Sequence, residues 1–258
     1  ESAWSYEIGT KGSLFDRRIY FNVNAFYVDW KSQQLTRSEA YVTSAGPAAN
    51  AAFIQNAGES EIKGLEFDVS GRATDWLYLR AAYTLVDAKF IDFDDENTER
   101  IFDTDGFPSF LPNGTRNPAD TDTRNGQVKG NRLAQTPQHQ FVVTAEARQP
   151  FGDYEAFLRS DLSYESKRYV QVDNLSHTGD SYLWNVSAGV ERDNWSFQLF
   201  VENLLDDRTP AVVTRLIDTR RLLSIPNGVG GRQTTFFRDF LISAPRKRQF
   251  GATATYRF

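Results

Sequence analysis

The sequence has no cysteine and no methionine, and it contains only two histidines, His139 and His177. Without cysteine, the chain cannot form a disulfide framework, a thiol nucleophile or a Cys-ligated metal site, and such a composition fits an exported bacterial protein. The absence of an initiator methionine, together with a patterned segment at residues 4–8, predicts a fragment that lacks its upstream part. No signal peptide is therefore expected in it.

Long apolar runs and an excess of basic residues are also lacking. Nowhere do about 18 consecutive apolar residues occur, which excludes a membrane-spanning helix but leaves a β-barrel possible, because barrel strands alternate and give no hydropathy peak. The formal net charge is -5. Because phosphate binding requires a clustered basic surface, nucleic acid is not expected as a partner.

Apolar and polar residues alternate with a period of two along most of the 258 residues. In residues 195–202 the odd positions are apolar, and the even positions are polar except for Phe200. The alternation predicts an all-β protein with strands at residues 2–15, 18–35, 59–73, 76–91, 132–149, 154–170, 181–192, 195–205 and 245–258. Most of these segments exceed the about five or six residues of strands in globular sheets, and they reach the about nine to eleven that cross a membrane.

Short and long connections alternate between these segments. Tight turns are predicted around Asp16, Asp75, Gly152 and Asp193, and long connections at residues 36–58, 92–131, 171–180 and 206–244. This predicts an antiparallel outer-membrane barrel, with short periplasmic turns at one rim and long extracellular loops at the other. A soluble β-sandwich remains the alternative, although compact domains seldom carry several structureless loops of this length.

The alternation also predicts which side chains face lipid and which face the barrel lumen. Expected to point outward are Phe21, Val23, Leu77, Leu79, Phe197 and Leu199, and expected to point inward are Arg80, Arg159, Asp161 and Glu202. Aromatic residues near the expected strand ends are typical of interfacial girdles: Trp4, Tyr27, Trp30, Trp76, Tyr83, Tyr164, Trp184 and Trp195.

Five segments resemble, in the same order, strands of the TonB-dependent receptors. They are FYVDWK at 26–31, NAGESEIKGLEFD at 56–68, NRLAQTPQH at 131–139, FVENLLDDR at 200–208 and PRKRQFGATATYRF at 245–258. Leu205 stands where the family's penultimate strand has Phe, which is a mild departure. Each motif alone is weak, but their shared order covers nearly the whole chain.

The resemblance implies a barrel of about 22 strands around a plug domain. Residues 1–258 would then be the C-terminal part of the barrel, with about nine strands, and the plug and the N-terminal strands would be absent. It also implies a receptor in the bacterial outer membrane, in contact with outer-membrane lipid, that takes up a scarce ligand, with a ferric siderophore as the first hypothesis and energy from TonB acting through the absent plug. Tyr256 and Phe258 match the family's C-terminal signal for the outer-membrane assembly machinery.

Candidate ligand-binding residues lie in two of the long connections. They are Phe102, Phe107 and Phe110 in one, and Arg232, Phe236, Phe237 and Arg238 in the other. Aromatic rings and guanidinium groups together can bind an anionic, partly aromatic ligand by stacking and paired hydrogen bonds. Packing of the long loops against each other is the alternative role.

Metal, cofactor and catalytic sites find little support. Asp103 and Asp105 lie in a segment that is similar to part of a calcium loop, but Ile101 occupies its first Asp position and no bidentate Glu follows. No cofactor is expected, and the sequence has no nucleophile elbow, phosphate loop or metal-spaced His pair, so the chain is not predicted to be an enzyme. A passive porin-like or structural barrel and, less favoured, a barrel-embedded hydrolase remain alternatives.

Overall fold

The structure is a computed structural model that describes residues 1–43, 46–95, 118–119, 126–226 and 232–258. For residues 36–43, 46–53, 55, 57, 216–226 and 232–238 it describes the backbone alone. Among the described residues, no helix has the length and apolarity needed to cross a membrane.

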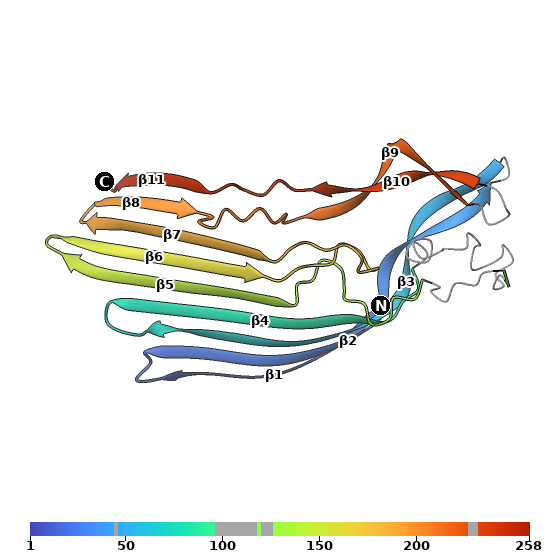
Figure 1. Cartoon of the computed structure of the whole chain (residues 1–258). Helices are drawn as coiled ribbons and strands as arrows, with labels where there is room; N and C mark the ends of the chain where they lie inside the picture. The colour runs from blue at the N-terminus through green and yellow to red at the C-terminus, as the bar shows by residue number, and fades with distance from the viewer. Residues whose placement is uncertain (44–45, 96–117, 120–125, 227–231) are drawn as a thin grey trace.

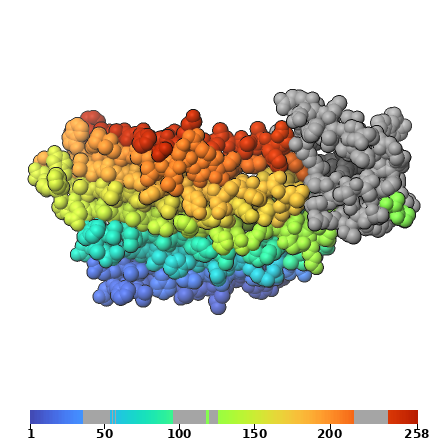
Figure 2. All heavy atoms as spheres, viewed as in Figure 1, coloured from blue at the N-terminus to red at the C-terminus, as the bar shows by residue number. Residues whose placement is uncertain are grey.

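Nine strands form one antiparallel sheet in the order β1-β2-β3-β4-β5-β6-β7-β8-β11, and β9 and β10 form a separate hairpin (Figure 1). The strands are β1 Ser2–Leu14, β2 Ile19–Thr43, β3 Gly46–Arg72, β4 Leu77–Asp92, β5 His139–Phe151, β6 Tyr154–Glu165, β7 Ser181–Arg192, β8 Trp195–Glu202, β9 Val213–Pro226, β10 Arg232–Ile242 and β11 Gln249–Tyr256. Figure 2 shows them as a continuous wall, coloured in chain order from blue to red. The all-β antiparallel prediction of about nine strands is confirmed.

The four tight turns lie together at one end of the sheet, which is also where β11 ends (Figure 1). Positive φ angles at Asp16, Gly152 and Asp193 provide the sharp reversals that these connections of two or four residues require. His177 lies in a connection at the opposite end, as predicted. Two other loop positions, Gly106 and Gly228, lie outside the described residues.

The connections at the loop end differ from the prediction. Residues 36–43 and 46–58 extend the β2–β3 hairpin, and residues 206–244 contain the β9–β10 hairpin, so the prediction of structureless loops is wrong there. The strand predicted from residue 132 begins only at His139. Pro137 has no N–H to donate to a ladder. Before it, Asn131 and Leu133 hydrogen-bond to the β4 backbone at Phe90 and Ala88, and Asn131, Arg132 and Gln135 bond to the connection after β6.

The strands have one apolar and one polar face. Partners in an antiparallel register share a face, and Leu199 pairs with Ala188, which pairs with Leu158. Arg159, the residue after Leu158, is therefore on the opposite face, where it pairs with Glu146. Followed from strand to strand, the register places every residue predicted to point outward on the apolar face and every residue predicted to point inward on the polar face.

Large apolar side chains on the apolar face are exposed, with Leu158 at 52% and Leu199 at 55% of full exposure. Such a continuous exposed apolar surface matches a wall that is bathed in lipid. We therefore refer to the apolar side as the outer face and to the polar side as the inner face.

Aromatic residues mark both borders of the outer face. On β6, Tyr154 and Tyr164 are ten residues apart, which at about 3.4 Å per residue and a tilt of about 40° corresponds to about 26 Å across the membrane. Tyr164 stacks on Phe141 of β5 with ring centroids 5.0 Å apart. This spacing agrees with an apolar band of about 25 Å between two girdles. The prediction that Trp30 belongs to a girdle is wrong. Trp30 pairs with Ser60 on the inner face, and its indole N–H donates to the Glu1 carboxylate.

Phenylalanines on the inner face cover glycines. Directly opposite one another are Phe26 and Gly64, Phe157 and Gly189, and Phe200 and Gly251. A Cβ added to these glycines would lie 2.1, 2.7 and 2.1 Å from the facing ring, respectively. The ring thus lies over the neighbouring strand in place of a side chain, which is a known way to stabilise glycine in a sheet. This explains why Phe200 interrupts the polar pattern.

A small apolar core lies at the loop end. Phe90, Phe93 and Val128 are buried there, and Leu35, Leu133 and Val172 pack around them. The β2 bulge at Ser32, with a φ of 52°, lies beside this core and is followed by a buried hydrogen bond from Ser60 to Gln33. The core fixes the bases of three connections relative to each other.

Candidate functional site

The inner face carries a cluster of ion pairs on β5, β6 and β7. Arg148 contacts Glu146 at 2.6 Å, Glu155 at 2.7 Å and Glu191 at 3.3 Å. Arg159 lies 3.2 Å from Glu146 and 2.8 Å from Asp161, which also accepts a hydrogen bond from Thr144. Two guanidinium groups thus face four carboxylates, which leaves this part of the wall hydrophilic and acidic.

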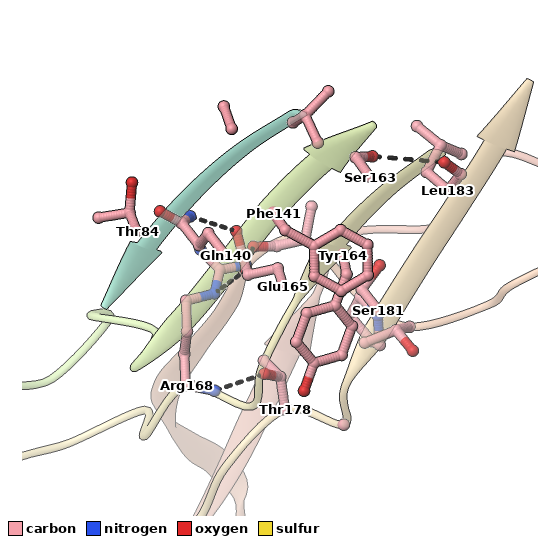
Figure 3. Close-up of a pocket in the computed structure, with 16 residues that line it drawn as sticks. Thr84, Gln140, Phe141, Ser163, Tyr164, Glu165, Arg168, Thr178, Ser181 and Leu183 are labelled. Atoms are coloured by element: carbon pink, nitrogen blue, oxygen red, sulfur yellow. Dashed lines mark hydrogen bonds and ion pairs between the residues drawn. The ribbon is translucent and has the colours of Figure 1, made fainter. Parts of the chain in front are cut away.

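A hollow of about 430 Å³ lies on the inner face, loopward of these ion pairs. This size is within the about 300 to 1,000 Å³ of ligand pockets. Its polar lining comes from β4 to β7 and from the connection after β6: Thr84, Gln140, Ser163, Glu165, Arg168 and Ser181. Figure 3 shows Gln140, Glu165 and Arg168 directed toward one another across it.

Arg168 is the central group of the hollow. Its Nε lies 2.7 Å from a Glu165 carboxylate oxygen, and its Nη2 donates to the backbone oxygen of Ala211. Glu165 also accepts a hydrogen bond from the Gln140 amide. The Nε atom is buried in this ion pair. The hollow therefore contains a balanced charge pair surrounded by polar groups.

The connection between β6 and β7 is held over the hollow by the NRLAQTPQH segment. The Ser166 hydroxyl accepts hydrogen bonds from the backbone N–H groups of Gln138 and His139, both at 3.0 Å. Asn174 accepts from Arg132 N–H at 2.7 Å and donates to the Arg132 carbonyl at 2.9 Å. These bonds replace a strand ladder and fix the position of Arg168, whose own N–H donates to Thr178.

Asn203 and Asp206 form a clasp that joins the ends of β7 and β8 to the segment before β11. Asn203 is 3% exposed, with a φ of 52°, and its amide donates to the carbonyls of Asp207 and Arg246. Asp206 accepts hydrogen bonds from the Arg208 guanidinium and from Arg248 N–H. The Arg208 side chain, followed by the Arg248 backbone, lowers the pKa of Asp206 to about 2.

The residues predicted to bind ligand are only partly described. Phe102, Phe107, Phe110, Asp103 and Asp105 lie outside the described residues. For Arg232, Phe236, Phe237 and Arg238, the structure gives the backbone, which runs along β10.

The residues of the hollow were not predicted from the sequence as a site. Glu165 follows Asp161 by four residues, so the alternation places it on the inner face with Asp161 but marks no site there. Arg168, three residues further on, comes to it because the chain folds back after β6.

The histidines have ordinary partners in this fold. Nδ1 of His139 hydrogen-bonds to the Tyr83 hydroxyl at 2.8 Å, and Nδ1 of His177 donates to the Thr178 carbonyl at 2.7 Å. Within the described part of the chain, no three His, Cys, Asp or Glu side chains are placed to hold a metal ion.

A family model and a known receptor each match most of this chain. The family model described as TonB dependent receptor-like, beta-barrel, matches residues 1–204. The ferric-pyoverdine receptor PbuA of a Pseudomonas strain is 26% identical over 207 residues, which are 79% of this chain and 21% of that protein.

Solved structures share the architecture at low identity. The ferric yersiniabactin uptake receptor FyuA from Yersinia pestis has a TM-score of 0.64 at 14% identity, over 99% of this chain and 30% of that one. The siderophore receptor PiuA from Acinetobacter baumannii has a TM-score of 0.60 at 17% identity, over 98% and 28%.

This chain therefore spans about a fifth of the curated relative and about three tenths of these two structures. The family match covers more than half of the chain, and the strand order and the two faces agree with it. The chain belongs to the TonB-dependent receptors, an outer-membrane family of transporters and not of enzymes, and corresponds to part of their β-barrel.

Proposed function

We propose that this chain is the C-terminal part of a receptor barrel that takes up a ferric siderophore, with energy supplied by TonB through a plug domain outside residues 1–258. The observation that carries the proposal is the hydrophilic inner wall with a hollow at its loop end, where a ligand captured by the loops would enter the lumen. PbuA and FyuA, which are receptors for ferric siderophores, support this class of ligand.

The hollow suits a particular part of such a ligand. The guanidinium of Arg168 is balanced by Glu165, so the site has no net charge to attract a bare anion. The surrounding hydroxyl and amide groups of Thr84, Gln140 and Ser163 favour a neutral group with acceptor oxygens, such as an amide or hydroxamate. Phe102, Phe107 and Phe110, with Arg232, Phe236, Phe237 and Arg238, are proposed to bind the ligand's aromatic and charged parts at the loops.

Uptake of radioactive iron by cells that carry the complete receptor would test this proposal. A panel of purified ferric siderophores, including ferric pyoverdine, is offered to iron-starved cells with and without TonB. We expect accumulation of at least one complex that depends on both the receptor and TonB. Accumulation that persists without TonB would favour the passive channel, and no accumulation of any complex would contradict siderophore uptake.

Single substitutions then test whether the hollow contributes to ligand binding. Replacement of Gln140 by Ala removes the hydrogen bond to Glu165 and one polar group of the hollow, and we expect about fivefold to tenfold weaker binding of the transported complex. Ser196→Ala, on the same inner face but near the turn end, is the matched control and should bind as the original receptor does. Equal losses in both variants would contradict the assignment of the hollow.

Tyr256 and Phe258 are proposed as the signal for the assembly machinery. Tyr256 packs on Trp195, with ring centroids 4.9 Å apart, and Phe258 touches only the edge of Tyr256 among the ring contacts of the described residues. Because Phe258 is fully exposed, its removal should cost assembled barrels much less stability than Tyr256→Ala would. We expect its deletion to lower the amount of folded receptor in the outer membrane, as seen by heat-modifiable gel mobility and fractionation. An unchanged amount would leave Phe258 without this role.

A further inference from the structure

The connection between β8 and β9 runs outside any strand ladder at the loop end of the sheet. We call residues 207–212 of this connection the strap. Figure 1 shows it leaving the end of β8 and running toward the β9–β10 hairpin. Among the described residues, β9 and β10 pair only with each other. The position of the hairpin therefore depends on the segments at its base and not on pairing with the sheet.

The two segments at the base of the hairpin are joined to each other. The Val212 N–H donates to the Ser243 hydroxyl at 3.0 Å, and the Ser243 N–H donates to the Val212 carbonyl at 2.9 Å. The segment that leaves the hairpin thus follows the strap that enters it. Contacts that hold the strap in place consequently hold the hairpin as well.

Two hydrogen bonds fix the first half of the strap at the start of β7. The Asp207 carboxylate accepts from the Tyr182 N–H, and the Thr209 hydroxyl donates to the Asp180 carbonyl at 3.0 Å. Pro210 follows, and its ring restricts the backbone there. Because Thr209 and Pro210 also line the hollow, the strap forms part of the wall of that cavity.

The second half of the strap is held by Arg168. The guanidinium donates to the Ala211 carbonyl and pairs with Glu165, the last residue of β6. The backbone of Arg168 is fixed in turn, because its N–H donates to the Thr178 hydroxyl and its carbonyl accepts from the Thr178 N–H, both at 2.9 Å. One planar guanidinium can donate to two acceptors at once. Arg168 therefore links the strap to the sheet.

Contacts of β9 itself with the rest of the chain are longer. The Gln135 amide donates to the Val213 carbonyl at 3.3 Å, and the Arg215 guanidinium lies 3.8 Å from the Asp173 carboxylate. Hydrogen bonds and ion pairs weaken as these distances grow. The charge-assisted bond from Arg168 to the strap is shorter than either contact and is the strongest candidate for holding the hairpin.

We propose that Arg168 is a positioning residue: by holding the strap to the end of β6, it fixes the β9–β10 hairpin relative to the hollow. β10 carries the candidate ligand-binding residues Arg232, Phe236, Phe237 and Arg238. The hollow and the hairpin would then bind one ligand together, at a separation that Arg168 determines. The consequence for ligand binding rests on the proposed function, whereas the position of the strap does not.

Distances between two nitroxide labels in the complete receptor test the position of the strap without any ligand. One label is attached at Val212→Cys, where the side chain is 55% exposed, and the other at Asn194→Cys in the turn between β7 and β8. Residues 1–258 contain no cysteine, so the introduced thiols are the only ones in this part of the receptor. Double electron–electron resonance should give one narrow distance distribution in the original receptor.

Arg168→Gln should broaden this distribution, because the strap loses its link to β6. Arg168→Lys keeps a charge beside Glu165 but has no planar fork for the second acceptor, so it should broaden the distribution less. Lys167→Gln is the matched control, since it removes the neighbouring cation, which lies 5.5 Å over the Tyr169 ring, and the distribution should stay narrow.

An unchanged distribution in Arg168→Gln, or equal broadening in Lys167→Gln, would overturn the role of Arg168. Heat-modifiable gel mobility reports whether each variant is a folded barrel. If Arg168→Gln does not fold, Arg168→Lys decides, and a distribution as narrow as that of the original receptor would overturn the proposal.

Binding of ferric pyoverdine, the ligand that the name of PbuA gives, separates positioning from direct contact. Arg168→Gln and Arg232→Gln should each weaken binding about fivefold to tenfold. The double variant should lose clearly less than the product of the two losses, because a displaced hairpin no longer presents Arg232. Losses that multiply would make Arg168 an independent contact and overturn its positioning role. Absence of binding by every variant and by the original receptor would contradict the proposed ligand, and the label distances would still decide the role of Arg168.

Discussion

The two faces of the same strands have opposite compositions, although they share one backbone. On the outer face Leu158 and Leu199 are half exposed and make no polar contact, whereas on the inner face Arg148 and Arg159 join four carboxylates in a network. In a strand that separates lipid from water, the backbone N–H and C=O groups must hydrogen-bond to neighbouring strands. The side chains of each face then match the solvent that the face meets. The contrast shows that solvent, and not strand geometry, determines which residues are tolerated.

Adjacent residues of β8 give the largest expected difference between the faces. Leu199→Arg places a guanidinium on the outer face and should cost about 2 to 4 kcal/mol of folding free energy in lipid, whereas Gln198→Arg, on the inner face, should cost well under half as much. Urea titration of the complete receptor in phosphatidylcholine vesicles measures both. If Gln198→Arg is the more costly change, the faces are assigned the wrong way round.

The phenylalanines that cover glycines are apolar exceptions on the polar inner face, and substitution of the glycines tests these contacts. Gly251→Ala places a methyl group closest to the Phe200 ring, and it should destabilise the barrel by about 1 to 3 kcal/mol. Because the three nearest atoms all belong to that side chain, adding Phe200→Leu should recover part of the loss. At Gly189 the carbonyl of Phe197 is 2.3 Å from the added atom, so Phe157→Leu should not rescue Gly189→Ala. A double-mutant cycle without coupling at Gly251 would contradict the contact.

Acid should weaken the clasp at the loop end. The pKa of Asp206 is lowered to about 2 in the folded chain, below the about 3.9 of an unfolded one. Its ionised form therefore adds stability that is complete above about pH 4 and is lost as the pH falls through about 2. The protection factor of the Arg248 amide, which corrects hydrogen exchange for the pH dependence of the intrinsic rate, should fall over this window in the original receptor and not in Asp206→Asn. Asp16→Asn, at the turn end, serves as the control and should retain the dependence.

The smallest effect is expected in the inner network. Arg148→Gln leaves Glu146, Glu155 and Glu191 without their shared partner, but the groups are substantially exposed, so the loss should be about 0.5 to 1 kcal/mol and should shrink in high salt. Arg80→Gln, which removes the single pair with Asp68, should cost less. Urea titration at low and high salt compares them, and a salt-independent loss would point to the contact of the Arg148 guanidinium with the Phe157 ring.

Much of the transmembrane part could be predicted from the sequence. Alternation at residues 195–202 and the turn residues around Asp16 and Asp193 predicted strands, turns and faces, because two unlike solvents impose a period of two. Beyond the membrane both faces meet water, so alternation carries less information, and residues 36–58 were taken for a loop where the hairpin continues. The hollow depends on Arg168 and Ala211, which meet only through the folding of two connections, and no local pattern marks such a contact.

The glycines under Phe26, Phe157 and Phe200 limit which substitutions this sheet can accept during evolution. Neither member of a pair can be replaced freely: a larger residue in place of the glycine meets the ring, and a smaller residue in place of the ring leaves a bare stretch of backbone. Substitutions should therefore arrive jointly, and among descendants of this sequence Gly64 and Phe26 should be kept or lost together. Such linked positions would report strand register even where overall identity has fallen too low to align the chains.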